Sequence, residues 1–240
     1  MKSGGSAGGA SGAATRGILF DAGGTLIHLD GSRICRAAGL DAAAAGFARA
    51  EAAAGRALRA WMAENPQATD AERVPRFLDA ILLALGLEDP DRRRDAARAV
   101  AAEHVRANVW SRAGEGAIET LRELSRRGFR IGVVSNADGR VRALLDAAGF
   151  SAFLEVVVDS AEAGFEKPDP RIFHAATGAL GLLPADCVYV GDIYEIDVVG
   201  ARRAGMRAIL IGTGEADGDV ERIASLAELL EKFPAGPAPD

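Results

Sequence analysis

Cysteine and aromatic residues are scarce in this chain of 240 residues. The two cysteines, Cys35 and Cys187, lie far apart and match no metal-binding or redox spacing, so we expect two reduced thiols. No signal peptide is recognisable, which predicts a cytoplasmic protein. No apolar run approaches the roughly 20 residues that a membrane-spanning helix needs, so we expect no membrane association.

Positive charge is also limited, and it is carried almost entirely by arginine. The 28 Lys and Arg residues are outnumbered by 34 Asp and Glu residues, which gives a formal net charge of −6. Binding to a nucleic-acid backbone needs a basic face, so this balance argues against nucleic acid as the main ligand. The only lysines are Lys2, Lys167 and Lys232. A lysine in the body of the chain is therefore a candidate for a specific role.

The chain divides into three parts by composition. Residues 1–15 are mostly Gly, Ser and Ala, cannot bury a core, and are predicted to form a flexible tail. Residues 31–110 are rich in alanine and arginine, and apolar residues recur there at helical spacing. We therefore expect a small domain of about four helices at 31–110, inserted into an α/β domain formed by 16–30 and 111–240.

Short apolar runs predict five strands in the α/β domain, at 18–20, 131–134, 154–158, 188–190 and 208–211. Apolar strands that alternate with helices form a parallel sheet covered on both faces. Ligands bind such sheets at the carboxyl ends of the strands, where the strand order reverses. Asp21, Ser135 and Asp192 each follow the end of a predicted strand. The sequence therefore predicts an active site at that edge.

Acidic side chains and a lysine are expected to converge there. Asp21, Asp192 and Asp197 would repel one another, and a divalent cation is the natural way to keep such carboxylates ionised. Carboxylate oxygens suit Mg²⁺ rather than a metal that prefers thiolates. Lys167 would neutralise a transferring phosphoryl group, and the hydroxyl of Ser135 would donate to one of its oxygens.

Four segments, in order, resemble the motifs of haloacid dehalogenase-like (HAD) hydrolases: FDAGGTL at 20–26, VVSN at 133–136, KP at 167–168 and GDIYEID at 191–197. The continuation as far as Met206 resembles the closing motif of the phosphoglycolate-phosphatase-like branch. The resemblance extends from about Gly17 to Leu230. It implies a Rossmann-like parallel sheet, with the helical insert in the place of the family's type I cap domain.

The resemblance implies catalytic and metal-binding roles. Asp21 is then the nucleophile, which forms an aspartyl-phosphate, and it is also a ligand of Mg²⁺. The backbone carbonyl of Gly23 and the carboxylate of Asp192 are the other implied ligands. Asp197 supports the metal site through water or hydrogen bonds.

It also implies how a phosphoryl group is held. Ser135 and the amide of Asn136 bind its oxygens, and Lys167 pairs with the nucleophile and the intermediate. The implied substrate is a small phosphorylated metabolite. The low aromatic content, 5% of residues, fits this because few side chains could stack on a nucleobase. Either a monomer or a homodimer is compatible with the sequence.

Several of these residues have a simpler alternative. Asp197 would also serve as the cap of a following helix, and Ser135 as the end of a strand. Lys167 could be an ordinary surface lysine. His28 and His174 are expected to be ordinary helix or loop residues rather than catalysts. The arginines of the insert could meet an anionic substrate, but alanine-rich helices also display arginine for solubility.

Gly23 departs from the pattern of the family's phosphatases. Those enzymes carry a second aspartate two residues after the nucleophile, which protonates the leaving group and later activates water. Glycine keeps a carbonyl for Mg²⁺ but has no proton to give. General acid–base catalysis contributes about 10²–10⁴ in rate, so we expect a slow enzyme or one restricted to good leaving groups such as acyl or aryl phosphates.

The departure leaves other functions open. A haloacid dehalogenase also lacks the second aspartate, but that branch has a bulky aromatic residue there and needs no metal. A phosphonoacetaldehyde hydrolase needs a lysine in the cap, and residues 31–110 contain none. The remaining alternative is a binding or regulatory module with the same fold and no turnover.

Overall fold

The computed structural model describes residues 15–41, 44–212 and 219–236. Six strands form its central sheet within these ranges: β1 (Gly17–Phe20), β4 (Arg130–Ser135), β5 (Val156–Asp159), β6 (Cys187–Gly191), β7 (Arg207–Ile211) and β8 (Glu221–Ile223). All pair in parallel, in the order β5-β4-β1-β6-β7-β8. The predicted α/β class and the five predicted strands are confirmed, and β8 is an addition. The predicted tail, apart from Thr15, lies outside the described residues.

The order in which strands are added to the sheet reverses at β1. This strand pairs with β4 on one side and with β6 on the other. The sheet grows from β4 to β5, and the chain then returns to the other side of β1 to add β6 and β7. The carboxyl ends of β1, β4 and β6 therefore meet where the strand order reverses, which is where parallel sheets bind ligands.

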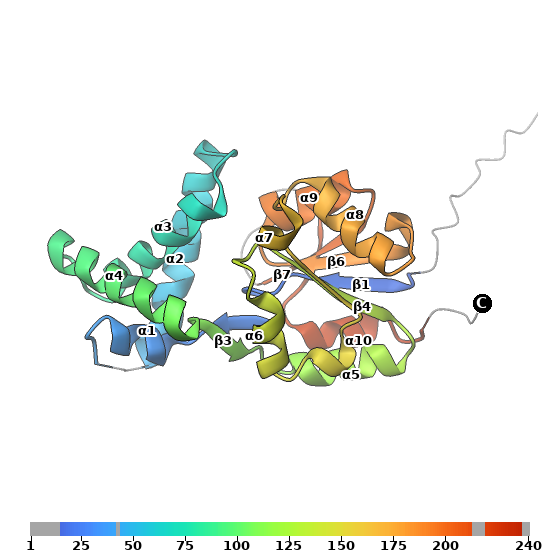
Figure 1. Cartoon of the computed structure of the whole chain (residues 1–240), viewed down its shortest axis with the longest axis horizontal. Helices are drawn as coiled ribbons and strands as arrows, with labels where there is room; N and C mark the ends of the chain where they lie inside the picture. The colour runs from blue at the N-terminus through green and yellow to red at the C-terminus, as the bar shows by residue number, and fades with distance from the viewer. Residues whose placement is uncertain (1–14, 42–43, 213–218, 237–240) are drawn as a thin grey trace, which may run out of the picture.

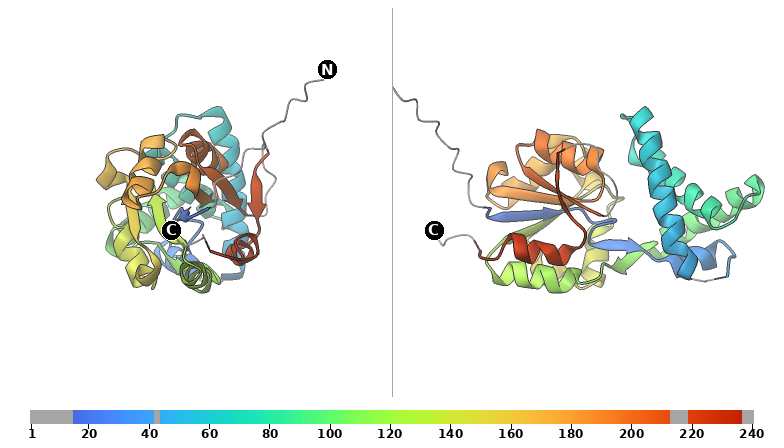
Figure 2. Two further views of the ribbon diagram at one scale, coloured as in Figure 1. Left: turned by 90° about the vertical axis from the view of Figure 1, so that its right-hand side faces the viewer. Right: turned by 180° about the vertical axis from the view of Figure 1, so that it is seen from behind.

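Helices cover both faces of this sheet (Figures 1 and 2). They are α5 (Ala117–Arg126), α6 (Val141–Ala147), α7 (Ser160–Ala163), α8 (Pro170–Ala179), α9 (Val199–Arg203) and α10 (Leu229–Lys232). Short 3-10 turns lie at Ser151–Phe153, Pro184–Asp186 and Leu226–Glu228, and a π-helical turn, η3, at Tyr194–Val198. Figure 1 shows α8 and α9 on one face of the sheet, with α5 and α10 on the other.

Alternation along β1 builds the two apolar layers of the core. Ile18 and Phe20 pack in the cluster that includes Leu121 of α5, whereas Leu19 packs in the cluster that includes Phe173 of α8. All five side chains are fully buried. Burial of each such side chain stabilises the fold by about 1.5–3 kcal/mol, which holds β1 firmly at the centre of the sheet.

Residues 31–110 contain four helices, the number that the sequence predicts: α1 (Gly31–Ala37), α2 (Ala44–Glu64), α3 (Asp70–Ala84) and α4 (Pro90–Ala107). They form a layer beyond the carboxyl edge of the sheet (Figure 1). Two short antiparallel strands, β2 (Ile27–Leu29) and β3 (Trp110–Ala113), connect this layer to the sheet. The sequence analysis does not predict this pair.

Helix starts in this layer follow the expected capping chemistry. The carboxylates of Asp30 and Asp89 accept hydrogen bonds from the backbone N–H groups of Arg33 and Arg92, at 3.0 and 2.8 Å. Pro75 lies inside α3, where its missing N–H costs one backbone hydrogen bond.

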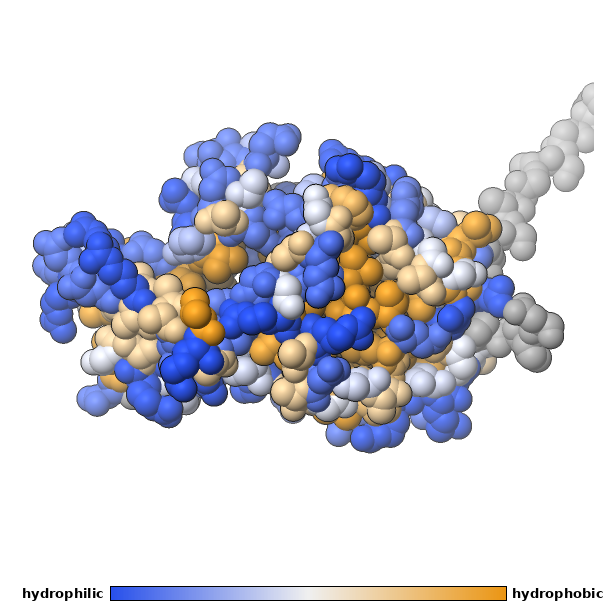
Figure 3. Space-filling model, in the orientation of Figure 1, coloured by the Kyte–Doolittle hydropathy of each residue, from blue (hydrophilic) through white to orange (hydrophobic). Residues whose placement is uncertain are grey.

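The hydropathy of the surface differs between the helical layer and the part that contains the sheet. In the view of Figure 3, hydrophilic residues dominate the outer end of the helical layer, and more hydrophobic residues show on the side that contains the sheet. None of the described helices combines the length and the apolar composition needed to cross a lipid bilayer.

Candidate active site

Three strand ends bring the predicted site residues together. Asp21 follows β1, Ser135 ends β4 and Asp192 follows β6. The backbone N–H of Asp21 donates to the carbonyl of Val190 on β6, at 2.8 Å, and extends the ladder between these strands by one residue. The side chains of Asp21, Ser135 and Asp197 are all buried. Parallel pairing thus collects residues that are more than a hundred positions apart in the chain.

Lys167 is the centre of the site. Its Nζ donates to Asp21 Oδ1 at 2.6 Å, to Asp197 Oδ1 at 2.7 Å and to the hydroxyl of Tyr189 at 2.9 Å. The side chain is only 2% exposed, so it is not a surface lysine. Burial alone disfavours the ammonium form, but the charges of Asp197 and Asp21 outweigh burial, and the pKa of Lys167 is raised well above its usual value. Lys167 therefore stays charged.

Tyr189 is a member of the site that the sequence analysis missed. Its hydroxyl accepts from Lys167 and donates to the carbonyl of Val134 on β4, at 2.9 Å. Burial raises the pKa of Tyr189 well above its usual value, so the phenol keeps its proton. One signal was available: a single polar atom sits inside the otherwise apolar strand β6. A buried tyrosine hydroxyl usually needs a partner.

Asn136 holds the backbone of Lys167. Its side-chain Oδ1 accepts from the N–H of Lys167 at 2.7 Å, and its Nδ2 donates to the carbonyl of Lys167 at 3.1 Å. Both the oxygen and the nitrogen of the Asn136 side chain are therefore hydrogen-bonded to the backbone of Lys167, which joins the loop after β4 to the loop that carries Lys167. Its predicted contact with a phosphoryl group stays a prediction.

Asp197 does not cap the helix that follows it, because the N-cap residue of α9 (Val199–Arg203) is Val198 and that helix has no side-chain cap. The predicted support of the metal site by Asp197 stays a prediction. The Oδ1 of Asp197 accepts from Lys167, and its Oδ2 accepts from the backbone N–H of Ile193 at 2.9 Å, which closes the π-helical turn η3. A Cβ on Gly191 would collide with the carboxylate of Asp197, so glycine is needed there for this close approach.

Three carboxylates are grouped closely enough that they could hold a cation. Oxygens of Asp21, Asp192 and Asp197 lie within 4.8 Å of one another. Asp192 Oδ1 is buried without a hydrogen-bond partner. Burial, with the neighbouring carboxylates, raises the pKa of Asp21 to about 7 and that of Asp192 well above its usual value. A buried carboxylate oxygen without a partner, beside two other hard oxygen donors, fits Mg²⁺.

Glycine also shapes this part of the site. Gly24 has a φ of +81°, which side-chain-bearing residues rarely adopt, and a Cβ there would collide with the carboxylate of Asp192. Gly24 therefore lets Asp192 approach the loop after β1. The predicted coordination by the carbonyl of the neighbouring Gly23 stays a prediction.

Gly23 faces an aromatic ring. A Cβ on Gly23 would lie 3.5 Å from both Cε3 and Cζ3 of Trp110, which is ordinary contact distance. The face of the indole thus lies beside the position from which a general acid would project. Trp110 lies at the start of β3, and the sequence analysis did not connect it with the site.

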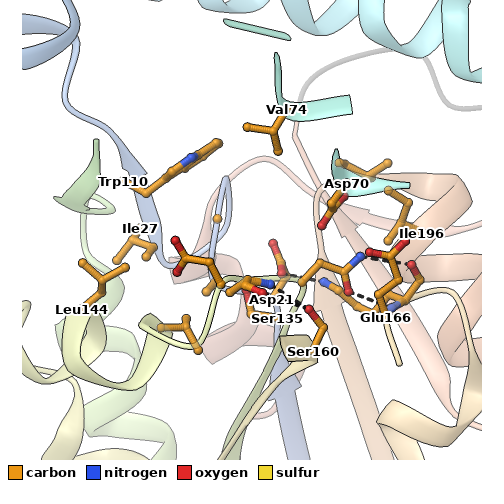
Figure 4. Close-up of a pocket in the computed structure, with 18 of the residues that line it drawn as sticks. Asp21, Ile27, Asp70, Val74, Trp110, Ser135, Leu144, Ser160, Glu166 and Ile196 are labelled. Carbon is orange, nitrogen blue, oxygen red and sulfur yellow. Dashed lines mark hydrogen bonds and ion pairs between the residues drawn. The ribbon is translucent and has the colours of Figure 1, made fainter. Parts of the chain in front are cut away.

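A cavity of about 470 Å³ opens above Asp21, between the sheet edge and the helices α3 and α4. In Figure 4, Trp110 and Val74 lie above Asp21, Ile27 and Leu144 on one side, and Asp70 and Glu166 on the other. Neither His28 nor His174 lines this cavity. The Nε2 of His174 lies 3.1 Å from the carbonyl of Ala204, which fits its expected structural role.

Comparison with known proteins adds three findings. The model of the haloacid dehalogenase-like hydrolase family matches residues 15–205. The chain is 42% identical over 101 residues to the haloacid dehalogenase-like hydrolase domain-containing protein 3 of Bos taurus, across 42% of this chain and 40% of that protein. It is 37% identical over 142 residues to the glyceraldehyde 3-phosphate phosphatase of Methanopyrus kandleri, across 59% of this chain and 60% of that protein. The matched segments thus cover less than two thirds of either relative.

A solved structure shows the same fold. The putative HAD-hydrolase YfnB from Bacillus subtilis, bound to magnesium, superposes with a TM-score of 0.65 at 18% sequence identity. The match covers 92% of this chain and 99% of that one.

Proposed function

Because the chain belongs to the haloacid dehalogenase-like hydrolases, we propose that it is a Mg²⁺-dependent phosphatase that acts on a small phosphorylated molecule through Asp21. The observation that carries this proposal is the buried contact of Lys167 with both Asp21 and Asp197, beside the unpartnered carboxylate of Asp192. The phosphatase name of the Methanopyrus kandleri relative is consistent with it.

The proposed reaction has two steps. The Asp21 carboxylate attacks phosphorus, a P–O bond forms to its oxygen, and the bond to the leaving group breaks. Water then attacks the aspartyl-phosphate, which releases phosphate and regenerates the carboxylate. Lys167 holds Asp21 Oδ1 at 2.6 Å and supplies positive charge beside the phosphoryl oxygens. The hydroxyl of Ser135 and the amide of Asn136 are the proposed donors to those oxygens.

Asp21, Asp192 and the carbonyl of Gly23 would hold Mg²⁺, with Asp197 in support. When bound, the ion supplies positive charge that offsets the phosphoryl and carboxylate charges and lowers the pKa of Asp21. Residues 31–110 are proposed as the cap that covers this site, and residues 16–30 and 111–240 as the core.

Restriction to good leaving groups follows from Gly23. Trp110 faces this position and offers no acid, so we propose that the departing oxygen leaves largely unprotonated. We expect kcat to fall steeply as the pKa of the leaving group rises across a series of phosphate esters. A flat dependence that includes simple alkyl phosphates would contradict the missing acid.

The test of the proposed function is phosphate release from acetyl phosphate and p-nitrophenyl phosphate, with and without Mg²⁺, by the natural protein and by Asp21→Asn. We expect turnover that needs both the ion and Asp21, with a loss of at least about 10³-fold in kcat in the variant. Turnover that survives Asp21→Asn, or no turnover of either compound, would overturn the proposal. The second result would favour a binding module without catalysis.

Gly23→Asp tests the missing acid directly. The backbone of Gly23 does not have the positive φ that would exclude a side chain, and a Cβ there meets Trp110 only at contact distance. We expect kcat for alkyl phosphates to rise by about 10²-fold, within the range of general acid catalysis. Gly23→Ala is the matched control, and it should give no gain.

Dehalogenation is a second candidate, and the indole beside Gly23 favours it. The sequence analysis expects an aromatic residue at this position in dehalogenases, and Trp110 supplies a ring there from another segment. Chloride release from 2-chloropropionate without Mg²⁺ would identify this activity. The unpartnered Oδ1 of Asp192 favours the phosphatase, because a reaction without metal leaves this buried polar atom without a partner.

A further inference from the structure

The cavity above Asp21 has an apolar wall that the proposed chemistry does not use. This wall consists of Ile27, Val74, Trp110, Val141 and Leu144. Val74 on α3 is 38% exposed, which is unusual for a large apolar side chain of this protein. Phe77 stacks behind the indole of Trp110, with ring centroids 6.5 Å apart and planes at 23°. The indole is therefore supported on one side by a second ring.

The charged side chains elsewhere in the lining are mostly carboxylates. Asp70, Asp138 and Glu166 contribute carboxylates to it, besides those of the catalytic cluster. Among the described lining residues, Lys167 is the one Lys or Arg side chain, and its ammonium is already shared by Asp21 and Asp197.

The nearest arginines are engaged as well. Nε of Arg73 donates to Asp70 Oδ1 at 2.8 Å, and Nη2 of Arg140 pairs with Asp138 Oδ2 at 2.5 Å. Neither arginine lines the cavity. The remaining basic side chain among the described lining residues, His104, is already paired with Asp138, at 3.3 Å. A substrate with a second anionic group would therefore meet carboxylates and only cations that already have a partner, and burial of an unpaired charge is costly.

These observations point to one class of leaving group. We propose that the substrate is an aryl phosphate monoester whose ring packs against Trp110 and Val74 and whose organic part carries no negative charge. Trp110 is then a specificity-determining residue. This inference rests on the proposed function and names the substrate class of that site.

The chemistry of Gly23 agrees with an aryl leaving group. In the first step, the bond between phosphorus and the phenolic oxygen breaks, and the electron pair stays on that oxygen. A phenolate is stable enough to leave without a general acid and takes its proton from water afterwards. An indole face beside Gly23 offers dispersion and edge contacts to the ring and no proton.

Binding can be measured without turnover. The chain has two tryptophans, Trp61 and Trp110, so the Trp61→Phe variant keeps Trp110 as its single fluorescent indole. Trp61 lies on α2 under the guanidinium of Arg76 and does not line this cavity. The fluorescence of Trp110 in this variant is followed, with Mg²⁺ present, as phenylphosphonate, methylphosphonate or 4-carboxyphenylphosphonate is added.

We expect phenylphosphonate to bind at least about tenfold more tightly than either of the other two, a difference of about 1.4 kcal/mol in each comparison. Affinity for 4-carboxyphenylphosphonate equal to that for phenylphosphonate would overturn the charge argument. Affinity for methylphosphonate equal to that for phenylphosphonate would overturn the role of the ring.

Steady-state kinetics distinguish the binding contribution of the ring from that of the phosphoryl group. We expect Trp110→Ala to raise KM for phenyl phosphate about tenfold more than KM for acetyl phosphate, which has no ring. Trp110→Phe should restore most of the loss, and Trp61→Phe should behave as the natural protein. Equal effects of Trp110→Ala on both substrates would overturn the inference, whereas turnover of acetyl phosphate that needs Asp21 would leave the proposed phosphatase standing.

Discussion

Asp21 shows how one residue depends on its neighbours. Burial is the main cause that raises its pKa to about 7 without a cation, and Lys167 opposes this shift. A carboxyl group with a raised pKa in the folded state contributes stability that is fully present below its unfolded pKa and is lost as the pH rises through about 7. The free energy of unfolding of the metal-free protein should therefore fall as the pH rises from about 4 to about 7.

Mg²⁺ should offset that loss by binding the ionised carboxylate. We expect the ion to raise the midpoint of thermal unfolding by more at about pH 8 than at about pH 5, because at low pH it must displace a proton. Differential scanning calorimetry of the metal-free and Mg²⁺-loaded protein at both pH values measures this. Asp21→Asn should reduce the pH dependence, and an equal effect of Mg²⁺ at both pH values would contradict the prediction.

Tyr189 is the second residue whose effect can be isolated. Tyr189→Phe removes a buried hydroxyl that contacts both Lys167 and the carbonyl of Val134. We expect a loss of about 1–2 kcal/mol in the free energy of unfolding, and a fall in kcat larger than the change in KM, because Lys167 is less well positioned.

Urea unfolding and steady-state kinetics measure these two effects. The matched control is Tyr194→Phe, because the hydroxyl of Tyr194 makes no hydrogen bond to the described part of the chain. A Tyr189→Phe protein with unchanged stability and unchanged kcat would show that this hydroxyl does not hold Lys167.

At the scale of elements, the loops that carry the site are tied together by Asp159. This buried carboxylate ends β5 and accepts from the N–H groups of Gly139, Val141 and Ala161, at 2.9, 3.3 and 3.0 Å. It therefore joins the start of α7 to the start of α6, which follows the loop after Ser135. A helix cap contributes about 0.5–2 kcal/mol.

Asp159→Ala should lower the free energy of unfolding by about 2–4 kcal/mol, since it leaves several buried N–H groups without a partner. Asp159→Asn keeps one acceptor oxygen and should cost less. Chemical denaturation measures both. An Asp159→Ala protein as stable as the natural protein would show that the hydrogen bonds of Asp159 contribute little.

Prediction of elements from the sequence succeeded where the patterns are long or strongly apolar. Five strands and the four helices of residues 31–110 have such patterns. The strands β2, β3 and β8 are short and mix polar with apolar residues, so no apolar run marks them. A proline favours the end of a helix, but Pro75 lies inside α3, because contacts of α3 with its neighbours outweigh the loss of one backbone hydrogen bond.

At the scale of the whole molecule, Arg140 links the sheet side of the cavity to the helical layer. Its Nη1 donates to the carbonyls of His104 and Val105 in the last turn of α4, both at 3.0 Å, while Asp138 pairs with both Arg140 and His104. A guanidinium at the carboxyl end of a helix also interacts favourably with the helix dipole.

We expect Arg140→Gln to lower the protection of the last turn of α4 against hydrogen–deuterium exchange by about tenfold, because charged hydrogen bonds contribute about 1.5–3 kcal/mol. Arg142→Gln is the control, since Arg142 lies in the first turn of α6, just after the N-cap residue Arg140, and its Nη2 donates to the carbonyl of Val157 instead. Unchanged protection in Arg140→Gln would mean that other contacts hold α4 in place.

The sequence by itself determined the parallel sheet, the strand ends that carry Asp21, Ser135 and Asp192, and the family, because strand periodicity and motif order are local properties of the chain. Tertiary structure alone decided which side chains touch. The bond of Tyr189 to Lys167, the hold of Asn136 on the Lys167 backbone and the indole beside Gly23 join residues far apart in the chain. Such contacts depend on packing distances, which no local pattern encodes.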